Sequence, residues 1–430
     1  MGKKYYAFHY AILLLNLADL MEVKRKMPSI TLKECPKVYI LETHRSKTPA
    51  DTLQFIEKIK ETAGMVSFRN ATEVDRIGIQ VFTCDRIRPD GSATSHTGKG
   101  VSPIQAKVSI TMEAIERYCS EFRKEYLDKL VKGSYRDLKS KFNVLDPRDL
   151  ILSQFSDYDH NKEITWAWGC DLAGEEDILV PACAVYHPYH EDSALLTKTH
   201  TNGIAAGNTM EEAVIHGLAE VIERDAWSIA QYTQHFHDAI FIEDDQENEF
   251  IIGIFKKFEK AGIEIVAKDI TTDVGMPVVA AFSRDLLHQT MAPIDGFGAH
   301  LDPKVATVRA LLEIATTRAL FIQKYGIEGM CETAPLYLRH GEEEDPRFYA
   351  HHQKGIKELE VGYSTDIYED IQNMISKLRA RGLNRVIAVN LTRSDVDIPA
   401  VRMIVPGMET YCFDKTRVGE RAMKALTDET

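Results

Sequence analysis

A nine-residue pattern of polar and charged residues occurs twice in this chain. Its copies are Ser109-x-x-x-Glu113-x-x-Glu116-Arg117 and His216-x-x-x-Glu220-x-x-Glu223-Arg224. A helix turns by about 100° per residue, so the polar residue and both glutamates of each copy share one stripe. Two such helices could direct four carboxylates to one place. Buried carboxylates need neutralising cations, and magnesium prefers oxygen ligands and phosphates. The pattern therefore predicts a magnesium site that also receives a polyphosphate.

Two other interpretations of these charges stay open at this point. Glu and Arg side chains three or four residues apart often lie on a solvated helix face. The first copy, however, shares its stretch with Ile110, Met112 and Ile115, and the second is equally rich in Val, Ile and Leu. Helices that are apolar over much of their circumference are largely buried. Buried structural ion pairs are then the main alternative to a ligand site.

The elements that carry the two copies have clear start signals. Ser102, Pro103 and Gln105 form a capping-box sequence before the first copy, and Thr209 with Glu212 does so before the second. Each start follows a glycine-containing stretch that we expect to be a turn: Gly98-Lys99-Gly100 and residues 202–208. Glycine turns at helix N-termini suit phosphate, although neither stretch has P-loop spacing.

A third helix is expected after Asp302-Pro303, with Arg309, Glu313 and Arg318 along it. Arg309 and Glu313 either pair with each other, or Arg309 and Arg318 share a face and both point at an anion. Further helices are expected at 50–64 and 368–382. Short apolar runs predict strands near 38–41, 77–82, 178–182, 263–267, 277–282, 385–389 and 401–405. The fold class predicted is α/β, or mixed α+β, with mixed and antiparallel sheets flanked by helices.

Composition limits the classes of partner. The 430 residues are 44% hydrophobic and carry a formal charge of −13, without a long Lys/Arg run, so we expect no nucleic acid partner. The seven cysteines include no C-x-x-C pair, which favours a reducing, cytoplasmic setting. The apolar run at 11–15 is too short to span a membrane.

We expect three segments along the chain. Residues 1–29 are interpreted as an extra N-terminal segment, poorly ordered, with translation starting at Met1, Met21 or Met27. Residues 30–100 form an N-terminal α/β module, and 101–430 form the main core with a C-terminal αβ part.

At this level of detail the motifs resemble the YcaO family. The two carboxylate patterns, the stretch 202–208 and the block from Arg309 to Arg318 are similar to that family's nucleotide and magnesium motifs. Four further stretches resemble the branch found in methanogens: residues 34–39, 75–79, 98–100 and 401–407. The matching stretches extend from about residue 30 onward.

The resemblance implies a YcaO-type fold with a buried site for ATP and Mg²⁺. It implies that the four glutamates of the two patterns hold magnesium and serve catalysis: Glu113, Glu116, Glu220 and Glu223. It implies that a second set contacts ATP: Ser109, Arg117, Asn202, His216, Arg224 and Arg318. Further members of the ATP site are Arg76, Lys99, Arg309 and Glu313.

The resemblance also implies an activity. YcaO proteins use ATP to activate backbone amides, and the methanogen branch implies attack by sulfide to give thioglycine in the α subunit of methyl-coenzyme M reductase. The sequence ends without a proline-rich tail and shows no fused substrate-recruiting module, which points to a separate TfuA-like partner. A homodimer is expected. The alternatives are azoline formation at Cys, Ser or Thr, and a non-catalytic ATP-binding subunit.

Overall fold

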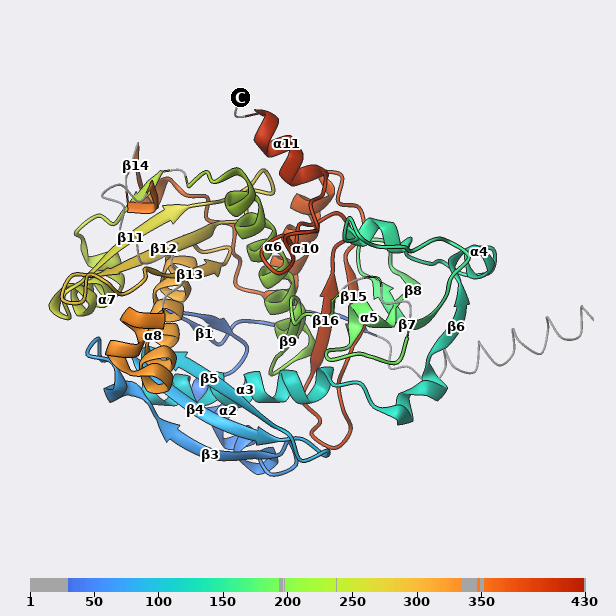
Figure 1. Ribbon diagram of the computed structural model, residues 1–430, viewed down its shortest axis with the longest axis horizontal. Coiled ribbons are helices and arrows are strands. Elements are labelled where there is room, and N and C mark those ends of the chain that lie inside the picture. Colours follow the sequence, from blue (N-terminus) through green and yellow to red (C-terminus); the bar gives the residue numbers. More distant parts are fainter. Residues whose placement is uncertain are drawn as a thin grey trace, which may run out of the picture.

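The structure is a computed structural model that describes residues 30–192, 196, 198–236, 238–333, 346–348 and 352–428. The predicted extra segment, residues 1–29, lies outside these ranges, so its interpretation stays a prediction. Within the described residues, the strands form four sheets. The two larger sheets stand on either side of a long central helix, and a smaller sheet lies below them (Figure 1).

The first large sheet has five strands in the order β13-β12-β11-β10-β14, at the left of Figure 1. All neighbours are antiparallel except the parallel pair of β10 and β14. The strands are β10 Ala239–Phe241, β11 Ile263–Asp269, β12 Val278–Asp285, β13 Ile294–Ala299 and β14 Gln353–Gly355. Nearly every residue of β12 and β13 is buried, because helices cover this part of the sheet.

The second large sheet has the order β6-β7-β15-β16-β9, with β8 also paired to β7. All of its ladders are antiparallel. Its strands are β6 Val131–Ser134, β7 Glu163–Asp171, β8 Glu176–Pro181, β9 Ile204–Ala206, β15 Ile387–Asn390 and β16 Ala400–Ile404. All five residues of β16 are buried, including an arginine, Arg402.

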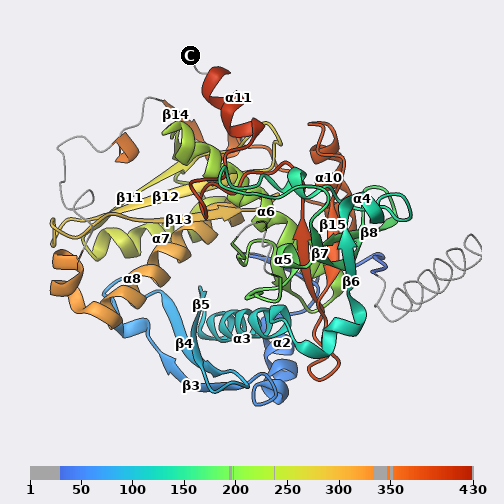
Figure 2. The same ribbon diagram turned by 45° about the vertical axis from the view of Figure 1, so that its right-hand side comes forward.

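The third and fourth sheets are smaller. Strands β3, β4 and β5 form an antiparallel three-stranded sheet, and β1 pairs with β2. Their bounds are β1 Tyr39–Ile40, β2 His44–Arg45, β3 Met65–Asn70, β4 Gln80–Ile87 and β5 Ala93–Gly100. Figure 2 shows the three-stranded sheet at the bottom of the molecule, with helix α3 (Pro103–Ser120) lying across it.

Helix α6 (Met210–Thr233) is the central element of the fold. It packs on β9 and β16 of one large sheet and on β12 and β13 of the other. The other α-helices are α2 Pro49–Ile56, α4 Tyr135–Leu138, α5 Ala182–Val185, α7 Glu249–Lys260, α8 Pro303–Thr333, α10 Ile367–Arg379 and α11 Glu420–Asp428. Short 3₁₀ turns occupy Glu57–Ile59, Thr72–Val74, Lys124–Lys129, Pro147–Leu150, Gln246–Asn248, Pro346–Phe348 and Ile356–Glu358.

Glycines let the three helices α3, α6 and α8 approach neighbouring backbone closely. A Cβ at Gly98 of β5 would lie 2.2 Å from the backbone nitrogen of Ile110 on α3, and one at Gly298 of β13 would lie 2.2 Å from the carbonyl oxygen of Ala306 on α8. A Cβ at Gly217 of α6 would lie 2.8 Å from the carbonyl oxygen of Gly203. Only glycine fits at these three positions, which we call glycine seats. They set how closely each helix packs against the neighbouring backbone.

The predicted fold class is confirmed. Helix starts at Ser102 and Thr209 also match: each side chain accepts an N–H bond from the residue three positions on. The Glu212 carboxylate, however, accepts from the Asn208 backbone N–H and from Ser46, so the second capping box is incomplete.

Three local predictions were wrong. The stretch Gly98-Lys99-Gly100 is the end of β5 and not a turn, because its glycines serve close packing against α3. Part of the expected 202–208 turn is strand β9, paired with β16. Helix α2 ends at Ile56, with a 3₁₀ turn after it, well before the predicted end at 64. Within the described ranges, no helix combines the length and apolar character that crossing a bilayer requires.

Candidate nucleotide and metal site

The predicted carboxylates lie on three helices that meet around strands β5, β9 and β13. Backbone N–H groups orient several of them. The Ala206 N–H donates to Glu116 Oε1 at 3.1 Å, and the Gly203 N–H donates to Glu220 Oε2 at 3.1 Å. Both donors belong to the β9 segment, so this one short stretch positions a carboxylate from α3 and a carboxylate from α6.

Lys99 joins the first and third helices. Its backbone N–H donates to Ser109 Oγ on α3 at 3.3 Å, and its ammonium donates to Glu313 Oε1 on α8 at 2.8 Å. The Phe297 N–H on β13 donates to the second oxygen of Glu313 at 3.2 Å. Ser109, Lys99 and Glu313, all predicted members of one site, therefore lie together.

The pKa shifts show which carboxylates influence one another, and they divide the glutamates into two overlapping groups. Burial raises the pKa of Glu116 to about 8, with further contributions from the Glu113 and Glu220 carboxylates and opposition from Arg117. Burial also raises the pKa of Glu223 to about 7, opposed by Arg224 and reinforced by Glu313 and Glu220. Glu220 belongs to both groups, so the carboxylates form an arc across α3, α6 and α8.

Cations compensate part of this arc. Arg224 lies 3.3 Å from Glu223 and 3.8 Å from Glu220, measured from Nη2 to the nearest carboxylate oxygens. Burial alone would raise the pKa of Glu313, but Lys99 and Arg224 keep it below its ordinary value. His96 Nδ1 lies 3.6 Å from Glu113. The structural ion-pair alternative thus accounts for some contacts of this site.

Structural ion pairs do not account for all of the polar groups of this site. Four of the predicted ATP-site residues have a buried polar atom that has no hydrogen-bond partner in the described part of the chain. These atoms are Arg117 Nη1, Asn202 Oδ1, His216 Nδ1 and Arg224 Nε. Buried polar groups in folded proteins are almost always satisfied, so orphaned atoms beside an acidic arc indicate a missing polar ligand.

The donor set suits magnesium only together with phosphates. Among the described residues, no three His, Cys, Asp or Glu side chains lie close enough to hold a metal ion by themselves. Magnesium in nucleotide sites usually takes one or two carboxylates and completes its shell with phosphate oxygens and water. An arc of separate, oxygen-only ligands fits that arrangement, whereas an all-protein metal cage does not.

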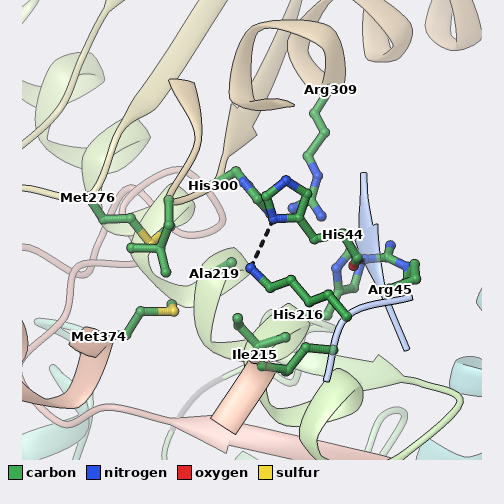
Figure 3. Close-up of a pocket in the computed structure, with 12 residues that line it drawn as sticks. His44, Arg45, Ile215, His216, Ala219, Met276, His300, Arg309 and Met374 are labelled. Carbon is green, nitrogen blue, oxygen red and sulfur yellow. Dashed lines mark hydrogen bonds between the residues drawn. The ribbon is translucent and has the colours of Figure 1, made fainter. Parts of the chain in front are cut away.

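A cavity lies beside α6 (Figure 3). His216 and Arg309, both predicted ATP contacts, line it together with His44, Arg45 and His300. Arg309 does not pair with Glu313: its Nη1 donates to the Ala299 carbonyl at 2.9 Å. Burial and the neighbouring Arg45 lower the pKa of Arg309 to about 10, opposed by Glu223 and Glu313. This cavity is cationic at the end next to the arc.

Arg318 and Arg76 are placed differently from the other predicted residues. Arg318 is 1% exposed and donates to Asp75 Oδ2 at 2.8 Å and Asp285 Oδ2 at 3.1 Å. Arg76 donates to Asp285 Oδ1 at 2.7 Å. Arg318 is thus held in a buried ion-pair network whose Asp285 also binds the more exposed Arg76, and no contact joins either guanidinium group to the glutamates among the described residues. The expected common face of Arg309 and Arg318 is not formed.

Sequence reasoning missed several residues around the arc. Arg402 on β16 is 4% exposed, and the Glu220 carboxylate is the main charge that favours its cationic form. An arginine inside an otherwise apolar strand was a usable signal. His44 and Arg45 come from β2, far away in sequence, and nothing in the local pattern indicates their role.

Fold and site together define a protein that brings an acidic arc and several arginines to one place, a combination suited to a magnesium–polyphosphate ligand. A family model described as "YcaO cyclodehydratase, ATP-ad Mg2+-binding" matches residues 97–409. The chain belongs to the YcaO family, whose members are ATP-dependent enzymes that act on peptides.

Individual relatives agree with this assignment. An uncharacterized protein of Methanothermobacter thermautotrophicus is 37% identical over 393 residues, covering 88% of this chain and 98% of that protein. The structure of YcaO from Methanopyrus kandleri bound with AMPPCP and Mg²⁺ is 30% identical, with a TM-score of 0.72 over 90% of this chain and 98% of that one. The predicted methanogen-type resemblance and the family cofactors, ATP and Mg²⁺, are confirmed.

More distant relatives show the fold. A heterocyclase in complex with substrate and cofactor superposes with a TM-score of 0.77 at 22% identity, covering 93% of this chain and 56% of that one. A Rhizobium leguminosarum bv. trifolii protein described as "Uncharacterized protein in tfuA 3'region" is 24% identical over 409 residues, covering 89% of this chain and 93% of that protein.

Proposed function

We propose that this protein is an ATP-dependent peptide thioamidase. It would replace the oxygen of a backbone amide by sulfur, giving thioglycine in the α subunit of methyl-coenzyme M reductase. The observation that carries the nucleotide part is the acidic arc on α3, α6 and α8, bordered by orphaned donor and acceptor atoms of Arg117, Asn202, His216 and Arg224. Similarity to methanogen relatives supports the substrate.

The net reaction balances with one ATP. Hydrosulfide adds to the carbonyl carbon, and the carbonyl oxygen accepts the terminal phosphoryl group of ATP with release of ADP. The sulfur then loses its proton, the oxygen departs as hydrogen phosphate, and a carbon–sulfur double bond remains. The reaction needs positioning and charge neutralisation and no covalent protein nucleophile. Bound magnesium would supply Lewis-acid stabilisation of the phosphate charges.

The residues of this chain would divide the work as follows. The glutamates would hold magnesium: Glu113, Glu116, Glu220 and Glu223. Arg117, Arg224 and Arg309 would neutralise phosphate oxygens, and Ser109, Asn202 and His216 would complete the nucleotide contacts. Lys99 and Glu313 would fix α3 and α8 relative to each other through their 2.8 Å ion pair. Arg76 and Arg318 would not contact ATP. They would act only as positioning residues, through their bonds to Asp75 and Asp285.

The partners are part of the proposal. A TfuA-like protein would present the substrate; the relative named after a tfuA 3' region supports this choice. The catalytic unit would be a cytoplasmic homodimer with the segment boundaries predicted at residues 30 and 101.

The experiment combines purified protein, a TfuA-like partner, Mg²⁺-ATP, sulfide and a peptide from the reductase α subunit. We expect phosphate release and a peptide whose mass increases by the difference between sulfur and oxygen. Loss of one water from the peptide would instead identify azoline formation. ATP binding without phosphate release or any mass change would identify the non-catalytic alternative, and either result rejects thioamidation.

A further inference from the structure

A second cavity lies beside β16, on the side of the site away from His44 and Arg309. Its apolar wall includes Cys183, Val221 and Met403, and its polar wall is formed by His200, Asn202, Arg402, Thr410 and Arg417. The stretch that carries Arg402, residues 401–407, resembled the family in sequence but has no role in the site described above.

The two arginines are buried and only partly satisfied. Arg402 is 4% exposed; its Nη1 donates to the His200 carbonyl at 2.7 Å, and its Nε has no partner. Arg417 is 3% exposed; its Nε and Nη2 donate to the carbonyls of Ile151 at 2.7 Å and Leu150 at 2.6 Å, and its Nη1 has no partner. Each guanidinium therefore retains one N–H group without a partner in the described chain.

Two further buried groups on the same wall are also unpaired. The Thr410 hydroxyl and the Asn202 side-chain oxygen have no hydrogen-bond partner among the described residues, and both side chains belong to residues less than a tenth exposed. The oxygen and nitrogen of an asparagine amide are interchangeable in placement, so Asn202 can equally present its NH₂ group. Asn202 is also a nucleotide contact in the proposed function, so the wall offers three donors of its own, from Arg402, Arg417 and Thr410.

The charge of this cavity is not compensated by its own walls. No Asp or Glu lines it, and the ion pairs within the described ranges include none to Arg402 or Arg417. Burial lowers the pKa of Arg402 to about 9, opposed by Glu220 and reinforced by Arg117 and Arg417, and burial also lowers the pKa of Arg417, opposed by Asp414. Buried cations whose counter-charges lie outside the wall are costly, and two of them in one wall are best explained by a bound anion.

We propose that this cavity is a binding site for a small tetrahedral oxyanion, with inorganic phosphate as its ligand. A tetrahedral oxyanion has enough acceptor oxygens to satisfy these donors, and arginine pairs well with phosphate oxygens. Hydrosulfide is a weak acceptor and would leave most of them unsatisfied. The proposed function supplies phosphate as a product, and in this one respect the inference rests on it.

The position of the cavity suits release of that product. Arg402 pairs in the β16–β9 ladder with Ile204, next to Gly203, whose N–H holds Glu220. Asn202 precedes Gly203 and lines the cavity. The β9 segment is thus a thin wall between the acidic arc and the anion cavity, and phosphate formed at the arc would have a cationic site directly behind it.

The test measures phosphate binding when the nucleotide site is already filled. Protein saturated with Mg²⁺ and AMPPCP is dialysed against radiolabelled inorganic phosphate, without peptide or sulfide. The variants are Arg417→Gln, Thr410→Val and, as a charge-matched control, Arg421→Gln. Arg421 pairs with Asp225 and Asp273 and does not line the cavity.

We expect the wild-type complex to bind phosphate and Arg417→Gln to weaken this binding at least about tenfold, the value of one charge-assisted hydrogen bond. Thr410→Val should weaken it about threefold or more, which keeps the test decisive if Arg417→Gln does not fold. Arg421→Gln should bind as the wild type does. AMPPCP affinity should be unchanged in all variants.

Two results would overturn the inference: no phosphate binding to the AMPPCP complex, or equal binding by wild type and Thr410→Val. Because the assay contains neither peptide nor sulfide, its outcome is independent of whether thioamide forms. A thioamidase without this site and an anion site in a protein that forms no thioamide are therefore distinguishable.

Discussion

Glu220 is the residue on which the two halves of the acidic arc depend. It is held by the Gly203 N–H, approaches Arg224, and influences the pKa of both Glu116 and Glu223. The two parts of the arc come from different helices, so a change at Glu220 alters both. Because Glu220 belongs to both parts of the arc, it is the most informative single position at which to test the metal-site assignment.

We expect Glu220→Gln to reduce ATP turnover by about a hundredfold or more, because loss of residues that merely support a metal ligand already costs about 10–100-fold. Turnover is measured as phosphate release under saturating Mg²⁺-ATP. Glu259→Gln, at an exposed position of α7, serves as the control and should be fully active. Full turnover by Glu220→Gln would contradict the metal-site assignment while leaving the family assignment intact.

Three histidines shielded from solvent give the protein a pH-dependent stability. His44 and His300 are buried and His200 is half-buried, and they accept at Nδ1 from Lys37, the Asp302 N–H and Arg402 respectively. Burial and neighbouring cations lower the pKa of His44 to about 3 and hold those of His200 and His300 well below 6.5. All three therefore stay neutral in the folded protein.

The direction of this pH effect on stability follows from the linkage between proton binding and folding. Below the ordinary histidine pKa of 6.5 the unfolded chain binds protons that the folded chain does not, so the free energy of unfolding falls as pH falls. Between about pH 7 and pH 5 each histidine should cost about 2 kcal/mol. His300→Gln keeps an acceptor but cannot titrate. Denaturant unfolding at both pH values should show a smaller pH effect in this variant; an equal effect would exclude His300 as a source.

At the scale of elements, glycine seats decide where the site helices lie. Gly98 and Gly100 of β5 allow α3 to approach, and Gly296 and Gly298 of β13 do the same for α8. The first pair of glycines thereby positions Glu113 and Glu116 on α3. The second pair positions Arg309 and Glu313 on α8. The sequence had been interpreted as a phosphate-binding turn at 98–100, but the glycines there act through packing.

Gly98→Ala tests this role of the seat. Because the new Cβ would meet the α3 backbone at 2.2 Å, the helix must shift. We expect the free energy of unfolding to fall by about 2 kcal/mol, as in other overpacked cores, together with weaker Mg²⁺-AMPPCP binding. Denaturant unfolding and calorimetric titration measure the two effects.

Gly253→Ala is the matched control. Its Cβ meets no heavy atom within 4 Å, and it lies inside α7. Alanine should stabilise this helix by about 0.5–1 kcal/mol. If Gly98→Ala behaved like Gly253→Ala, close packing of β5 against α3 would not position the carboxylates.

At the scale of the whole molecule, a buried network holds the N-terminal part of the chain to the five-stranded sheet. Asp285 ends β12 and receives bonds from Arg76 and Arg318, while Asp75 receives another from Arg318. These residues come from segments that are far apart in sequence. The network therefore ties the segment before β4 to the same helix, α8, that carries Arg309 and Glu313.

Asp285→Asn should lower the free energy of unfolding by about 3–5 kcal/mol, because it leaves two arginines without their shared counter-charge. Glu264→Gln is the control: its ion pair with Arg284 lies on the surface of the same sheet and should contribute less than about 1 kcal/mol. Thermal and denaturant unfolding of both variants compare the two pairs. Equal effects would show that the buried network adds no more than a surface pair.

The sequence by itself determined the local features of this protein. Helix starts at Ser102 and Thr209, the strand near 401–405 and the two carboxylate stripes follow from capping, alternation and helical periodicity, which act over a few residues. The motifs carried the family and its cofactors for the same reason, because the spacing of Glu113 with Glu116 and of Glu220 with Glu223 is a local property.

Only the tertiary structure decided which residues meet. It placed Arg318 with Asp75 and Asp285 instead of beside Arg309, and it brought Lys99 to Glu313. It also buried Arg402 and Arg417 in the wall of one cavity that no carboxylate lines. Such contacts join residues separated by tens to hundreds of positions, and they depend on strand pairing and glycine seats, which no helical or strand period encodes.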